Sequence, residues 1–99
     1  MPTYITLVNY TQKGIENVKE SPARLDTVKK AMQAAGGEFK AFYLTMGRYD
    51  IVVISEAPND EAYAATMLAI GRAGAVRSET LKAFTEEEYR NIIASIPES

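Results

Sequence analysis

Apolar, β-branched and aromatic residues gather in four short runs of this chain, a pattern that is typical of β-strands. The pattern predicts strands over residues 3–10, 38–46, 50–56 and 75–84. In the first three runs both alternating sets carry apolar or aromatic residues, so neither face of the predicted sheet is plainly suited to solvent. The pattern therefore predicts that both faces of the sheet are covered.

The region between the first two strands has the spacing of an amphipathic helix. Thr11 is a plausible N-cap for its first part, and the Ser21-Pro22 step interrupts it. We expect a new helix there, with Ser21 as N-cap and Pro22 at the first helical position, ending at Gly36-Gly37. Apolar residues recur at helical spacing along one stripe, and Arg24 is expected to face solvent.

Two further helices are predicted after the third and fourth strands. Asn59 or Asp60 caps a helix that reaches Ala73 and is so rich in alanine that it is expected to approach the sheet closely. Thr85 and Glu88 form a capping-box pattern, which predicts a short helix near the end of the chain.

The order of these elements is β-α-β-β-α-β followed by a short helix. With right-handed crossovers, this order predicts an α+β fold, a ferredoxin-like antiparallel sheet with both long helices on one face. The other, apolar face then needs a cover, and we expect a second copy of the chain to provide it, as a homodimer or higher homo-oligomer. The alternative is that the terminal helix folds over the open face of a monomer.

The strongest local signal is the predicted hairpin at the middle of the chain. Residues 46–54, Met-Gly-Arg-Tyr-Asp-Ile-Val-Val-Ile, strongly resemble the GYD domain family, named for a Gly-x-Tyr-Asp signature in this hairpin. The resemblance covers nearly the whole chain, and its other matching pieces are Glu56-Ala57-Pro58, Tyr10-Thr11 with Gly14, Ser21-Pro22-Ala23-Arg24, Gly36-Gly37 and residues 80–85. It implies one ferredoxin-like subunit over residues 1–99, similar to dimeric α+β-barrel proteins. The biochemical function of the family is not established.

The amino-acid composition excludes several kinds of catalytic and metal-binding site. The chain has 99 residues with no Cys and no His, which excludes disulfides, thiolate or imidazole metal sites, and nucleophiles paired with a histidine. We expect no cofactor and no metal. A net charge of −2, with both signs interspersed, predicts no nucleic-acid partner. Without a long apolar run or a signal peptide, we expect no membrane partner and a cytoplasmic protein.

Five residues are candidates for a ligand site, although no catalytic residue can be assigned. Tyr49 and Asp50 place a phenol beside a carboxylate at the hairpin, where they either fix the turn or orient a polar ligand. Arg77 on the last strand either lies on a charged edge or binds an anion inside a cavity. Tyr10 and Tyr43 either line the same cavity or pack in an interface.

These observations favour a small homo-oligomeric domain that acts as a small-molecule-binding or assembly module. The lack of a recognisable catalytic constellation supports a non-enzymatic role. The rival hypothesis is a cofactor-independent enzyme of the dimeric α+β-barrel kind, such as a small oxygenase or isomerase. Any acid–base chemistry in such an enzyme would come from Asp, Glu, Lys or Tyr.

Overall fold

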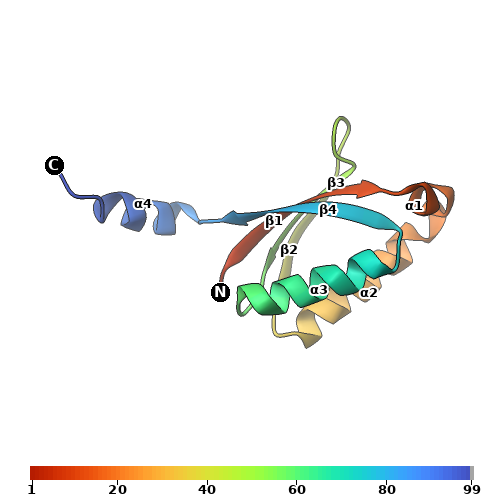
Figure 1. Ribbon diagram of the computed structural model, residues 1–99, viewed down its shortest axis with the longest axis horizontal. Helices are drawn as coiled ribbons and strands as arrows, with labels where there is room; N and C mark the ends of the chain where they lie inside the picture. The colour runs from red at the N-terminus through yellow and green to blue at the C-terminus, as the bar shows by residue number, and fades with distance from the viewer. Residues whose placement is uncertain (99) are drawn as a thin grey trace.

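The computed structural model describes residues 1–98 and is built on an antiparallel sheet (Figure 1). Its four strands are β1 (Thr3–Tyr10), β2 (Glu38–Leu44), β3 (Ile51–Glu56) and β4 (Val76–Ala83), in the spatial order β2-β3-β1-β4. β1 lies in the interior of the sheet, where Ile5 pairs with Ile54 on one side and with Leu81 on the other. This topology confirms the predicted α+β, ferredoxin-like class.

The helices follow the strands in the predicted order. Their bounds are α1 (Gln12–Glu16), a 3₁₀ turn η1 (Val18–Glu20), α2 (Ser21–Ala34), α3 (Asp60–Arg72) and α4 (Glu86–Ala94). Figure 1 shows α2 and α3 side by side on one face of the sheet, as predicted from the crossover order. The break between α1 and α2 falls at the Ser21-Pro22 step.

Local hydrogen bonds explain where three of the helices begin. The side chain of Thr11 accepts a hydrogen bond from the backbone N–H of Gly14, and that of Asn59 accepts one from Ala62. Thr85 and Glu88 form the complete capping box at the start of α4. These contacts satisfy backbone donors that helix starts otherwise leave unpaired.

The expected cap at Ser21 is wrong. α2 begins at Ser21 itself, and Glu20 stands before it without a side-chain hydrogen bond to the helix. The Ser21 hydroxyl lies instead 3.0 Å from the phenol oxygen of Tyr10. Ser21 therefore links α2 to the end of β1.

Two clusters of buried side chains lie on the helix side of the sheet, and the first of them packs α3 against the sheet. The first consists of Tyr4, Ala57 and Tyr63, and the rings of the two tyrosines stack with centroids 3.9 Å apart. The second, on β1 and β3, consists of Val8, Ile51 and Val53. Burial of these side chains supplies the main favourable free energy of the fold.

The opposite face of the sheet, here called the open face, is apolar at its centre. Tyr4, Thr6 and Val8 of β1 are buried beneath the helices, so the alternate residues of the sheet point away from them. The registers place eight apolar side chains on this open face: Ile5, Leu7, Ala41, Tyr43, Val52, Ile54, Leu81 and Ala83. Both faces of the sheet thus carry apolar residues, and that the open face is also covered stays a prediction.

Helix α4 does not fold over the open face. It continues in the direction of β4 and carries the chain away from the sheet (Figure 1), and each of its residues is exposed. The radius of gyration is 15.4 Å, against about 13 Å for a compact chain of this length. The self-covering alternative therefore fails in this conformation.

The hairpin between β2 and β3 projects beyond the sheet (Figure 1). Gly47 at its tip has φ +131°, a backbone conformation that side-chain-bearing residues rarely adopt. Met46 beside it is 101% exposed. Gly47 thus allows the tight turn at the tip of the hairpin.

Candidate functional site

Asp50 ties the hairpin to β1. Its Oδ2 accepts a 3.0 Å hydrogen bond from the backbone N–H of Tyr10, and its own backbone N–H donates to the carbonyl of Val8 at 2.9 Å. Its carbonyl accepts from the N–H of Thr45 at 2.8 Å, which closes the hairpin. These bonds to backbone groups fix the path of the chain at the base of the turn.

Tyr49 points along the open side of the sheet. Its hydroxyl donates to Oε2 of Glu79 at 2.8 Å, and the guanidinium of Arg48 lies 5.4 Å from its ring centroid. Tyr49 and Glu79 come from segments that are far apart in the sequence, so this contact joins the hairpin to β4. Glu79 is exposed to solvent and Tyr49 is half-buried.

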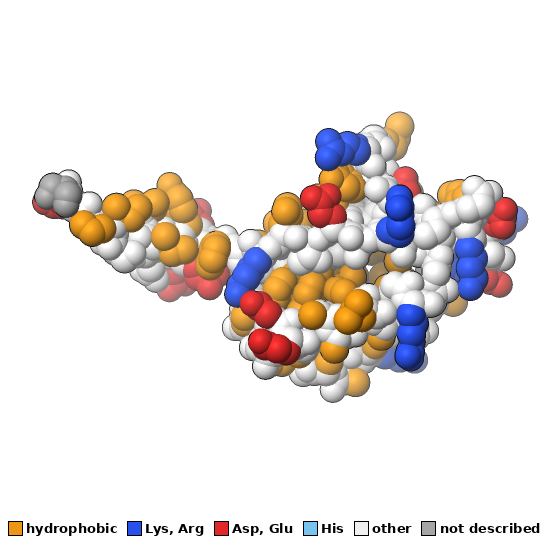
Figure 2. Space-filling model, viewed as in Figure 1, with side chains coloured by type: hydrophobic (Ala, Val, Ile, Leu, Met, Phe, Trp, Pro, Cys, Tyr) orange, Lys and Arg blue, Asp and Glu red, His pale blue; other side chains and the backbone are white. Residues whose placement is uncertain are grey.

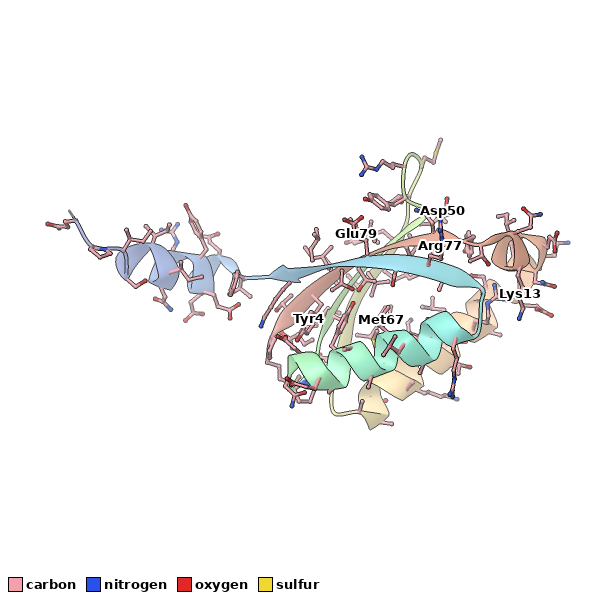
Figure 3. All side chains as sticks on the ribbon, in the orientation of Figure 1. Tyr4, Lys13, Asp50, Met67, Arg77 and Glu79 are labelled. Atoms are coloured by element: carbon pink, nitrogen blue, oxygen red, sulfur yellow. The ribbon has the colours of Figure 1, made fainter. Side chains whose placement is uncertain are left out.

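Arg77 and Tyr43 belong to the open face. Thr80 of β4 lies within 3.0 Å of the Tyr63 hydroxyl beneath the sheet, so alternation places Arg77 on the other side. Figure 3 shows the labels of Arg77, Glu79 and Asp50 on the side of the sheet away from α3. Tyr43 is exposed at the same face. The structure therefore does not bring these candidates together in one enclosed pocket.

Tyr10 is the exception, because it lines a large cavity on the helix side of the sheet. The cavity has a volume of about 590 Å³ and lies between the sheet, α2 and α3. Val8, Phe42 and Val53 form part of its floor, and Figure 2 shows the surface hollowed between the sheet and α3, with hydrophobic side chains inside. Ala65 and Ala69 of α3 line the cavity yet are exposed, since methyl groups are too small to close it.

Arg24 is a cavity residue that the sequence pattern missed. It was expected to face solvent, but it lines the cavity together with Ser21 and Tyr10. Its Nη1 lies 3.3 Å from the carbonyl of Asn17 and 3.6 Å from Oε2 of Glu20, whereas its Nη2 is buried without a hydrogen-bond partner among residues 1–98. A signal was present, since Arg24 stands four positions before Val28 and so shares its helical stripe.

A second polar cluster lies at the other end of β1. The hydroxyl of Tyr4 donates to Oδ1 of Asp60, and the ammonium of Lys82 lies 3.1 Å from the same oxygen. Burial, together with the Asp60 carboxylate, raises the pKa of Tyr4 to about 12. The hydrogen bond from Tyr4 and then that from Lys82 lower the pKa of Asp60. Both pKa values are thus farther from neutral pH than usual, whereas a general acid or base requires a pKa near the working pH.

Clusters of metal-binding side chains and membrane-spanning helices are both absent from residues 1–98. Among residues 1–98, acidic side chains form no group of three or more that could hold a metal ion. Within the same residues, every helix is too short or too polar to cross a lipid bilayer.

The sheet order, the two helices on one face and the exposed apolar face opposite define an α+β domain of ferredoxin-like topology. The chain belongs to the GYD domain family, whose model matches residues 4–93. It is 33% identical over 84 residues to the glutamine synthetase and cystathionine beta-lyase binding protein of Thermus thermophilus, covering 84% of this chain and 88% of that protein.

A solved crystal structure of a Thermus thermophilus protein has the same fold. Its superposition gives a TM-score of 0.55 at 22% sequence identity and covers 86% of this chain and 95% of that one. At this identity the likeness concerns the fold alone.

Proposed function

We propose that this protein is a homo-oligomeric, non-enzymatic module that binds other proteins. The open face forms the contact between copies of the chain, in the manner of dimeric α+β-barrel proteins, and α4 contributes to the contact with a partner. The observation that carries the proposal is the apolar centre of the open face, which the described residues of the chain leave uncovered.

Self-association follows from the chemistry of the open face. Leu81 is 47% exposed and Tyr43 59% exposed at its two sides, and contiguous apolar surface of this kind mostly marks an interface. Charges of both signs surround the centre: Glu38, Lys40, Glu56, Arg77 and Glu79. A mixed rim of this composition can pair with itself across a two-fold axis.

Protein partners are suggested by the relative whose name describes binding to glutamine synthetase and cystathionine beta-lyase. In this chain the exposed helix α4 presents Tyr89, Ile92 and Ile93 at the spacing of one helical face, and the exposed Ile96 follows just after the helix. An amphipathic helix of this pattern is a common means of docking into an apolar groove of another protein. We propose enzymes of these two kinds as the first partners to test.

A catalytic role has less support. Tyr49, Asp50 and Arg77 make or lie near contacts that hold the sheet and hairpin rather than converging on a pocket. The pKa values of the Asp60 and Glu88 carboxyls are both lowered. A general base at neutral pH needs a pKa closer to 7. The rival enzyme hypothesis finds no specific observation in its favour.

Sedimentation of the purified protein tests the self-association step. We expect the wild type to sediment as a dimer or larger species at micromolar concentration, and Leu81→Glu to shift it toward monomer because a carboxylate would be buried in the contact. Leu68→Glu is the matched control, since Leu68 is 75% exposed on α3. A wild type that is strictly monomeric would refute the proposed assembly.

Binding to enzymes is tested separately by mixing the protein with glutamine synthetase or cystathionine beta-lyase from the same organism. A variant carrying both Ile92→Glu and Ile93→Glu should lose the complex because it makes the apolar face of α4 acidic. Asn91→Glu, on the opposite face of the helix, should retain it. Failure of the wild type to bind either enzyme would remove these partners from the proposal.

A further inference from the structure

We infer that the cavity beneath the sheet is a binding site for a small organic acid with an apolar body, held by Arg24. This site lies on the helix side, opposite the open face, so it does not depend on the proposed assembly. Of the sequence-derived candidates, it includes only Tyr10.

The size and lining of the cavity define the body of the ligand. A volume of about 590 Å³ lies in the range of ligand sites, about 300–1,000 Å³, and is far more than the small voids of a packed core. Phe39, Phe42, Val53, Met67 and Ile70 are among the lining residues. An aliphatic chain or aromatic ring is the group that such walls favour.

Three polar side chains that line the cavity where the start of α2 meets the end of β1 define the head group. Arg24, Ser21 and Tyr10 line it there, and the Tyr10 and Ser21 oxygens lie 3.0 Å apart. The Nη2 of Arg24 is buried and has no hydrogen-bond partner among the described residues. An unpaired, buried guanidinium N–H is costly, and a carboxylate matches its geometry better than any neutral group.

The other contacts of Arg24 do not prevent its guanidinium from binding a ligand carboxylate. Glu20, the acidic neighbour, is an exposed residue whose Oε2 lies 3.6 Å from Nη1 rather than from Nη2. An exposed ion pair one helical turn apart is weak. A ligand carboxylate can therefore bind Nη2 without displacing Glu20, after a rotation of the Arg24 side chain brings this buried atom to the cavity wall.

Calorimetric titration with decanoate and phenylbutyrate tests the assignment, with decanol as the uncharged match. We expect the wild type to bind at least one acid more tightly than decanol. Arg24→Gln should weaken binding of the acid by roughly ten- to a hundredfold, the loss of one charged hydrogen bond, and leave decanol binding unchanged. Arg77→Gln, on the open face, should have no effect on either.

A second pair of variants tests the location without touching Arg24. Ala69→Phe places a ring in the cavity and should abolish binding of the acid and of decanol, whereas Ala64→Phe on the same helix should not, because Ala64 does not line the cavity. Methionine methyl signals in NMR spectra give an independent readout. Met32 and Met67 line the cavity and should shift on titration, and the exposed Met1 and Met46 should not.

The inference is overturned if neither acid binds the wild type, or if binding persists unchanged in both Arg24→Gln and Ala69→Phe. Shifts confined to Met1 and Met46 would likewise place the ligand elsewhere. None of these outcomes reports on the oligomeric state, which sedimentation measures. Failure of the ligand site and failure of the assembly can therefore be distinguished.

Discussion

The carboxylate of Asp50 accepts a hydrogen bond of 3.0 Å from the backbone N–H of Tyr10. These two residues are 40 positions apart, and the bond holds the base of the Gly-x-Tyr-Asp hairpin against the end of β1. Tyr10 in turn directs its hydroxyl toward Ser21 at the start of α2. One acidic side chain thus fixes the position of a residue that lines the cavity on the other side of the sheet.

Removing the Asp50 carboxylate should therefore reduce stability. Asp50→Ala leaves the Tyr10 N–H without its partner, and we expect the free energy of unfolding to fall by about 1–3 kcal/mol. Asp50→Asn keeps an oxygen acceptor and should cost less. Urea denaturation measures both, and equal stability of the alanine variant and the wild type would show that the bond contributes nothing.

Glycine-to-alanine substitutions at two helical positions should have opposite effects. A Cβ at Gly14 would lie 1.9 Å from the carbonyl oxygen of Ala75, so Gly14→Ala must displace backbone and should destabilise by about 1–3 kcal/mol. At Gly71 a Cβ would meet nothing within 4 Å, and Gly71→Ala should stabilise by about 0.5–1 kcal/mol. Thermal unfolding of the two variants provides the comparison, and a shift of the same sign in both would contradict it.

The shifted pKa of Tyr4 predicts a loss of stability at high pH. Because the pKa is about 12 in the folded protein against 10.0 ordinarily, folding favours the neutral phenol. This contribution is complete below pH 10 and is lost as pH rises from about 10 to 12. Ultraviolet titration should resolve one phenol with a raised pKa. This phenol should be missing in Tyr4→Phe and still present in Tyr89→Phe, where an exposed ring is changed.

Stability curves at several pH values provide the second readout for Tyr4. The wild type should lose more stability between pH 10 and 12 than Tyr4→Phe does. If all six tyrosines titrate together near their usual pKa, the predicted environment of Tyr4 is wrong.

Helix α4 should be stable only when it is bound. A helix of nine residues with every side chain exposed gains little from packing, and isolated helices of this length are marginal in water. We expect backbone amides of α4 to exchange rapidly with deuterium in the free protein and to become protected in a complex. Thr85→Ala removes the N-cap of α4 and so raises the free energy needed to form the helix. This variant should therefore bind the partner more weakly. Protection of α4 in the dilute, isolated chain would contradict this prediction.

The sequence alone determined most of the architecture because its signals are local. Alternation on β1 and β3, the cap at Thr11 and the Thr85–Glu88 capping box depend on neighbouring residues, and each appears where it was predicted. The order of elements then fixed the sheet topology through the rules for crossovers. The Gly-x-Tyr-Asp resemblance to the GYD family rested on the same local residues.

Only the tertiary structure decided which side chains meet. Asp50 lies beside Tyr10 and Tyr49 beside Glu79 because three strands bring distant segments together, a relation that no periodicity encodes. Arg24 was expected to face solvent because it is charged, although it shares the helical stripe of Val28, and it lines a cavity because α2 and α3 leave space between them. Sequence patterns specify the face of an element, whereas the packing of whole elements determines what that face contacts.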